Sequence, residues 1–173
     1  IRDKATVDIA LKAALTGHLV FSTLHTNDAP SSITRLINMG TPNYLISAAL
    51  TLIMAQRLAR KSCLDCRVID ENITPKLLNS IGFLPEQSAR AKIYKGTGCE
   101  QCGGSGYRGR MGIYEILEVD NELKAGILSN LQQTELNAIA KKNGFKTMQD
   151  MGQDLLLSGD LSFAEYERVL QSS

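Results

Sequence analysis

The sequence HLVFSTLHTN, residues 18–27, carries the most information about the fold. It begins with a short run of apolar residues, a pattern typical of a strand buried on both faces of a sheet, and turns polar toward its C-terminal end. In open α/β sheets, ligands bind beyond the carboxyl ends of the strands. We therefore expect Thr23, His25, Thr26 and Asn27 at a ligand-binding edge, and an α/β fold.

Helical patterns lie on both sides of this predicted strand. Apolar residues recur at helical spacing over residues 5–14. Asp28 is expected to cap the next helix, with Pro30 in its first turn, and Gly40 is expected to end it. A further helix is predicted over residues 42–60, because its apolar residues again recur at helical spacing.

The composition excludes several classes of protein. The 173 residues carry 19 Lys and Arg against 18 Asp and Glu, and only 5% are aromatic, which argues against a strongly basic nucleic-acid-binding protein. No apolar run approaches the ~20 residues that a membrane span needs, and no signal peptide pattern is present. The sequence therefore predicts a soluble cytosolic chain. Because Ile1 leads directly into a helical pattern, we also expect a piece of a longer protein.

The four cysteines form two C-x-x-C pairs, Cys63-Leu-Asp-Cys66 and Cys99-Glu-Gln-Cys102. Two such turns can present four thiolates to one tetrahedral ion, so the spacing favours a closed structural zinc site. Two disulfides, a redox dithiol and unrelated buried cysteines are the alternatives. Disulfides are disfavoured by the missing signal peptide, and a redox dithiol by the presence of two pairs.

The remaining elements follow from periodicity and capping residues. Asp120 is expected to cap the first helix of the tail, and Ser162-x-x-Glu165 has the spacing of a capping box. A strand is predicted over residues 113–119, and helices over 76–81, 122–128, 134–143, 148–157 and 162–170.

The two histidines both lie between Gly17 and Asn27. His18 is expected to be structural. For His25 the alternatives are a hydrogen-bonded core histidine and a donor to a phosphate oxygen, and its place near the polar end of the predicted strand favours the second. No G-x-x-x-x-G-K-[ST] phosphate loop occurs in the sequence, so this chain is not expected to hold ATP phosphates alone.

Several blocks together resemble the secretion ATPase superfamily, and within it the assembly (extension) ATPases of type II secretion and type IV pili. The blocks are Ile1–Asp3, Ala14–Ala29, Ala55–Arg60, the four cysteines, and Gly106–Glu115. The resemblance covers essentially the whole chain.

This resemblance implies the distal part of a RecA-like P-loop NTPase core, from a parent that hydrolyses ATP with Mg²⁺ as a cytoplasmic homo-hexamer. The parent would act at the inner membrane through a platform protein, and no nucleic acid is expected as a partner. Pilus assembly and type II secretion both remain open. In the family, Ile1–Asp3 closes the Walker B segment, whose glutamate would precede Ile1. The fragment itself is therefore expected to be inactive.

The resemblance also assigns domains and site residues. Residues 1–60 would be the distal core with the His box, 61–112 the zinc-binding insertion, and 113–173 the final strand with a helical C-terminal subdomain. His25 matches a histidine that senses or positions the γ-phosphate. Thr23, in the same His box, and Arg110, which matches an arginine near the adenosine portion, would contact the nucleotide.

Another class of function is a stand-alone zinc-binding interaction module. Such a module would have a basic surface for nucleic acid, formed by Lys61, Arg67, Arg108 and Arg110. The near-zero net charge and the scarce aromatic residues disfavour this function. The second cysteine pair with its glycines also resembles the zinc repeat of J-domain co-chaperones. That resemblance is local, because Cys66 is followed by no glycines.

Overall fold

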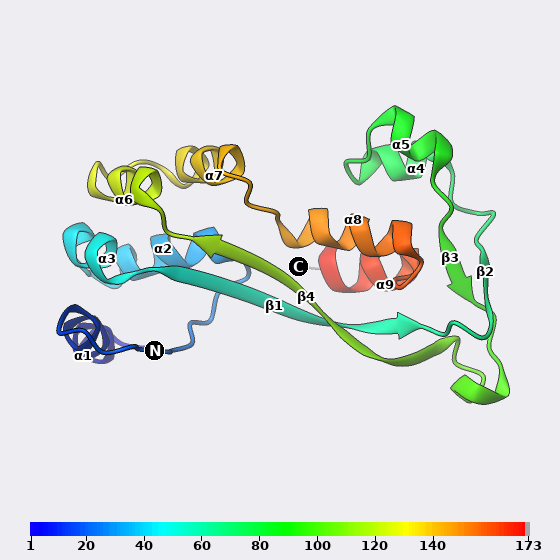
Figure 1. Cartoon of the computed structure of the whole chain (residues 1–173), viewed down its shortest axis with the longest axis horizontal. Helices are drawn as coiled ribbons and strands as arrows, with labels where there is room; N and C mark the ends of the chain where they lie inside the picture. Colours follow the sequence, from blue (N-terminus) through cyan, green and yellow to red (C-terminus); the bar gives the residue numbers. More distant parts are fainter. Residues whose placement is uncertain (172–173) are drawn as a thin grey trace. The chain divides into compact units, whose positions relative to one another are not determined.

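The computed structural model describes residues 1–171 and divides into two compact units. Unit 1 joins Ile1–Ala55 to Glu115–Thr147, and unit 2 joins Gln56–Tyr114 to the described residues from Met148 onward. Strands β1 (Leu52–Ser62) and β4 (Tyr107–Glu118) pair with each other, and each has residues in both units (Figure 1). The predicted domains 1–60, 61–112 and 113–173 stay a prediction, because a division into compact units does not test where the domains of a family begin and end.

Unit 1 is built mainly from helices. They are α1 (Lys4–Leu15), α2 (Ala29–Asn38), α3 (Asn43–Ala49), α6 (Asn121–Leu128) and α7 (Gln133–Lys142). Three of them begin at an aspartate whose carboxylate accepts a hydrogen bond from a backbone N–H of the first turn. These N-caps are Asp3, Asp28 and Asp120, with N–O distances of 2.9, 2.7 and 2.8 Å. The two caps predicted from the sequence, Asp28 and Asp120, are confirmed.

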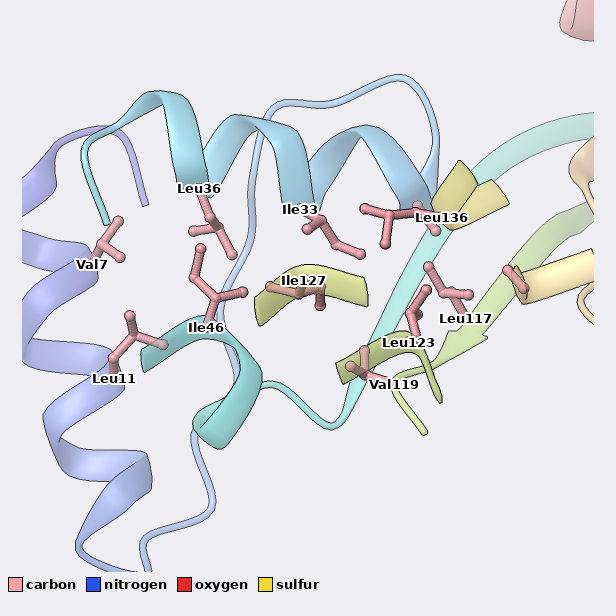
Figure 2. Packing of buried hydrophobic residues seen from close by; sticks show 12 residues of the cluster. Val7, Leu11, Ile33, Leu36, Ile46, Leu117, Val119, Leu123, Ile127 and Leu136 are labelled. Atoms are coloured by element: carbon pink, nitrogen blue, oxygen red, sulfur yellow. The ribbon is translucent and has the colours of Figure 1, made fainter. Parts of the chain in front are cut away.

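The core of unit 1 is a cluster of aliphatic side chains (Figure 2). Val7 of α1, Ile33 of α2, Ile46 of α3 and Ile127 of α6 are all completely buried. Full burial of each such side chain contributes about 1.5–3 kcal/mol. Since these residues come from both ends of the sequence, unit 1 requires residues 1–55 and 115–147 together.

The predicted strand over residues 18–26 is absent. This segment has no regular secondary structure, and Leu19 and Phe21 are 81% and 86% exposed. A strand buried on both faces needs hydrogen-bonded neighbours and packed layers. Within the described part of the chain, no strand pairs with this segment. The expectation of a buried strand was therefore wrong for this structure.

The helix predicted over residues 42–60 is also wrong. Helix α3 ends at Ala49, and β1 starts at Leu52. The strand shows alternating exposure, with Leu58 55% exposed and Ala59 1% exposed. Leu, Ala, Gln and Arg favour helices in isolation, but pairing with β4 overrides that weak preference.

Unit 2 contains a second, smaller sheet. Strands β2 (Arg67–Ile69) and β3 (Tyr94–Gly96) pair antiparallel with Val68 opposite Lys95. Helices α4 (Pro75–Ser80) and α5 (Pro85–Arg90) lie between them in sequence (Figure 1). Helix α4 confirms the predicted helix at 76–81, whereas β2, β3 and α5 were not predicted.

The tail helices agree closely with their predicted ranges. Helices α6 and α7 confirm two of them, and α8 (Met148–Ser158) confirms the third. The predicted helix over 162–170 is instead divided into α9 (Phe163–Tyr166) and a π-helical turn over Glu167–Gln171. Predicted strand 113–119 is the end of β4, which starts earlier, at Tyr107. Among the helices of residues 1–171, none combines the length and apolar character that membrane crossing requires.

Candidate functional sites

The four cysteines come together in unit 2. Cys63 follows β1 and Cys66 precedes β2. Between β3 and β4, Cys99 precedes the 3₁₀ turn η1 (Glu100–Cys102) and Cys102 is its last residue. The Sγ–Sγ distances are 3.8 Å for Cys63–Cys99, 3.9 Å for Cys66–Cys102 and 3.7 Å for Cys99–Cys102. Four sulfurs placed tetrahedrally at about 2.3 Å from one zinc ion lie about 3.8 Å apart. The donor set and its spacing therefore fit a closed four-sulfur site.

Backbone N–H groups also face this cluster. Those of Cys99 and Gly106 each donate to Cys102 Sγ over 3.2 Å. The hydrogen bond from Cys99 and then that from Gly106 lower the pKa of Cys102 to about 6, against the opposing effect of burial. Burial raises the pKa of Cys63. Since the thiolate is the form that binds metal, Cys102 is prepared for coordination.

The turn that carries the second cysteine pair requires glycine at two facing positions. A Cβ at Gly96 would overlap the Gly106 carbonyl oxygen. Gly106 has a φ of +76°, which L side chains rarely adopt. These glycines let two backbone segments approach closely beside the cysteines.

His25 lines a polar pocket of about 440 Å³ in unit 1. Asn27, which precedes α2, lines it too, as do Ser31 and Arg35 of α2 and Gln133 of α7. No acidic residue lines this pocket. Among the described residues, the His25 imidazole forms no hydrogen bond. It is therefore free to donate to a ligand.

Hydrogen bonds to buried and partly buried groups hold the turn beside His25. Glu115 of β4 is only 4% exposed, and its carboxylate accepts the backbone N–H of Ala29 at the start of α2. Thr26 Oγ1 and Ser32 Oγ share a hydrogen bond of 2.8 Å. Because these contacts fix residues 26–32, the position of His25 depends on β4 as well as on its own segment.

Thr23 and His25 do not line the same pocket. Thr23 lines a mostly apolar pocket of about 270 Å³ with Val7, Leu11 and Ile53. Although Thr23 and His25 are only two positions apart in the sequence, they line different pockets.

Arg110 lines a pocket of about 420 Å³ in unit 2 together with Arg60 and Arg168. Both of the latter arginines bind the carboxylate of Glu165, whose side chain is fully buried. Burial alone would raise the pKa of Glu165, but hydrogen bonds from Arg168 and Arg60 lower it to about 2. This carboxylate is therefore ionised at neutral pH.

Sequence reasoning missed Arg60, Arg168 and Glu165 as members of one site. The only signal was the predicted capping box at Ser162-x-x-Glu165. Ser162 Oγ does accept the backbone N–H of Glu165 over 3.3 Å. The Glu165 carboxylate goes to the arginines, one of them 105 residues away, and that pairing has no local sequence pattern.

Comparison with known proteins identifies the family to which this chain belongs. Residues 1–168 match the family described as Type II/IV secretion system protein, and the chain belongs to that family. Relatives with ATPase names include "Type IV pilus assembly ATPase PilB" of Thermus thermophilus, 45% identical over 95% of this chain and 18% of the relative. "Putative type II secretion system protein E" of Escherichia coli is 39% identical over 100% of this chain and 34% of the relative. This chain thus spans between about a fifth and a third of these two relatives.

Two solved structures share the fold. The pilus retraction motor PilT with bound ADP superposes with a TM-score of 0.62 at 24% identity, covering 100% of this chain and 37% of that one. The Legionella pneumophila ATPase DotB superposes with a TM-score of 0.63 at 20% identity, again covering 100% of this chain and 37% of that one. At these identities the likeness concerns the fold alone.

Proposed function

We propose that this chain is the C-terminal part of a hexameric ATPase that powers assembly of a type IV pilus or a type II secretion pseudopilus. The observation that carries the proposal is the match over residues 1–168, with relatives named as a pilus assembly ATPase and a type II secretion protein E. The parent protein hydrolyses ATP with Mg²⁺ in the cytoplasm and works on an inner-membrane platform protein. The chain contributes the distal part of its RecA-like core.

In this proposal His25 acts on the terminal phosphate. Its imidazole is exposed in a pocket lined by hydroxyl, amide and guanidinium groups, with no carboxylate to repel an anion. It donates a hydrogen bond to a phosphate oxygen and so reports whether the γ-phosphate is present. The nucleotide contact of Thr23 rests on the family resemblance alone, because Thr23 lines a different pocket from His25.

Arg110 contributes from unit 2. Within residues 1–171 its guanidinium forms no hydrogen bond or ion pair, so it is available for the adenosine portion of the nucleotide. A guanidinium plane stacks well on an aromatic base.

By itself, the chain does not hydrolyse ATP. Phosphoryl transfer depends on a loop that cradles the phosphates, on Mg²⁺ and on a positioned water. The sequence of 173 residues contains no phosphate loop. Its own residues sense and close the nucleotide site rather than lower the barrier.

The tetracysteine cluster holds a structural zinc ion in this proposal. Cys63, Cys66, Cys99 and Cys102 supply all four ligands, which leaves no open position for catalysis. When bound, the metal supplies folding free energy by joining the segment after β1 to the segment before β4.

The test of His25 uses the longer protein that contains this chain. His25→Ala should lower kcat for ATP hydrolysis about tenfold or more, because a hydrogen bond to a charged group is lost in the transition state. His18→Ala is the matched control: it removes a histidine of the same segment that bonds Thr16 Oγ1 over 3.1 Å. An unchanged kcat in His25→Ala would refute the phosphate-sensing role.

A further inference from the structure

A glutamate of β4 lies on the strand face that packs into the core of unit 1. Glu115 and Leu117 are 4% and 2% exposed, whereas Ile116 between them is 53% exposed. Leu117 belongs to the aliphatic cluster of unit 1 (Figure 2). Because a carboxyl group loses free energy when it leaves water without a hydrogen-bond partner, a glutamate on this face requires a specific partner.

One partner is the start of α2, 86 residues earlier in the sequence. Glu115 Oε1 accepts the backbone N–H of Ala29, the first residue of that helix, and Ala29 is completely buried. N–H groups of the first helical turn have no acceptor within the helix. The next two residues do not need β4, because Pro30 has no N–H and the N–H of Ser31 donates to Asp28. Glu115 thus supplies the acceptor that Ala29 lacks within its own helix.

His25 stands four residues before Ala29, in a segment without regular secondary structure. Helix or strand hydrogen bonds within that segment therefore do not hold the imidazole in place. Two contacts join its end to the rest of unit 1: the hydrogen bond of 2.8 Å between Thr26 and Ser32, and the bond from Ala29 to Glu115. The anchored start of α2 therefore sets where the imidazole lies in its pocket.

We infer that Glu115 is a positioning residue for His25. Glu115 does not line the His25 pocket, so its effect passes through the N–H of Ala29. This inference rests on the proposed function, in which His25 donates to the terminal phosphate. A misplacement of about 1 Å in such a contact can lower a rate about a hundredfold. What Glu115 supplies is an acceptor at the right reach, and its charge is secondary.

The first experiment observes the His25 imidazole by proton NMR in the 173-residue chain at fixed pH. The chain has two histidines, so His18 serves as an internal reference. Glu115→Asp keeps the carboxylate but withdraws it from Ala29 by one methylene group, and it should shift the His25 ring signal alone. Glu118→Asp is the control, because it makes the same change at an exposed position of the same strand, and it should shift neither signal. An unmoved His25 signal in Glu115→Asp would overturn the inference, whatever His25 does in catalysis.

The second experiment measures ATP hydrolysis by the longer protein that contains this chain. Glu115→Asp should lower kcat about fivefold or more and change KM less than about twofold, because the position of His25 matters in the transition state. Glu115→Gln loses the charge but keeps an oxygen acceptor at the same reach, so its kcat should stay within about twofold of the unmodified protein. If the glutamine variant were slower than the aspartate variant, the charge would be what matters, and the positioning role would be overturned.

A double variant separates positioning from a general loss of stability. In His25→Ala the residue that Glu115 positions is gone, so adding Glu115→Asp should lower kcat less than about twofold further. Equal losses in both backgrounds would mean that Glu115 acts on the fold and not through His25, which would overturn the inference. Circular dichroism checks that the variants compared are folded. If His25→Ala alone leaves kcat unchanged, the phosphate-sensing role fails, while the NMR comparison still decides whether Glu115 positions the imidazole.

Discussion

At the scale of single residues, the contrast around Glu165 is the most informative feature. Its carboxylate is fully buried, whereas the side chains of Arg60 and Arg168 are 48% and 54% exposed. Each arginine keeps part of its hydration, so the desolvation penalty falls mainly on the acid. The interaction therefore fixes the position of β1 residues against the C-terminal turn within unit 2.

Replacing Glu165 by Gln should lower the free energy of unfolding by about 1.5–3 kcal/mol, because its hydrogen bonds lose their ionic character. Urea denaturation followed by circular dichroism measures the change. Glu71→Gln is the control, since Glu71 is exposed and forms no ion pair within residues 1–171. If Glu165→Gln and Glu71→Gln lowered the free energy of unfolding equally, the buried carboxylate would not stabilise the fold.

The same residue predicts an acid dependence. The pKa of Glu165 is lowered in the folded state from 4.5 to about 2. A carboxyl with a depressed folded pKa stabilises the fold fully above its unfolded pKa, and this contribution is lost as the pH falls through the folded value. The stability gap between the unmodified chain and Glu165→Gln should be full above about pH 5 and should shrink between pH 4.5 and 2. A gap that stays constant over this range would contradict the assignment.

What the sequence predicted at this scale depended on spacing along the chain. The C-x-x-C pairs predicted that the four cysteines would meet, and their Sγ atoms all lie within 4.8 Å of one another. The roles of His25, Thr23 and Arg110 stay predictions, since no contact in the structure tests them. Glu165 and its arginines could not be predicted, because a contact between residues 60 and 165 leaves no local periodicity.

At the scale of elements, the start of α2 decides where His25 lies. Asp28 caps this helix by accepting the backbone N–H of Ser31 over 2.7 Å. Asp28→Ala should lower the free energy of unfolding by about 1 kcal/mol. Asp28→Asn should lower it much less, because an amide oxygen can cap the helix equally well. Hydrogen exchange of the Ser31 amide should accelerate in the first variant only. Equal exchange in both would mean that the cap does not hold this turn.

The errors of sequence prediction at this scale share a physical cause. The pattern of residues 18–26 describes a strand with neighbours on both sides, and the described chain supplies none. Residues 52–62 carry strong helix formers, yet β4 lies beside them and pairs with them as a strand. Caps and tail helices were predicted well because their signals are local, involving residues three or four positions apart.

At the scale of the whole molecule, the tetracysteine cluster should control the stability of unit 2. We expect one zinc ion per chain by metal analysis, and Cys63→Ser should remove it and lower the melting temperature. Leu64→Ala is the matched control, because Leu64 lies between the two cysteines but is 57% exposed and offers no ligand. A melting temperature insensitive to chelators and to Cys63→Ser would argue against a metal staple.

We propose that this chain is part of a secretion ATPase and acts only together with the phosphate-binding part of the parent. Steady-state ATP hydrolysis by the 173-residue chain, compared with that of the longer protein containing it, tests this most directly. We expect turnover by the longer protein and none above background by the chain alone, since the 173 residues contain no phosphate loop. Turnover by the chain alone at a rate comparable to the longer protein, or no ATP hydrolysis by the longer protein, would contradict it.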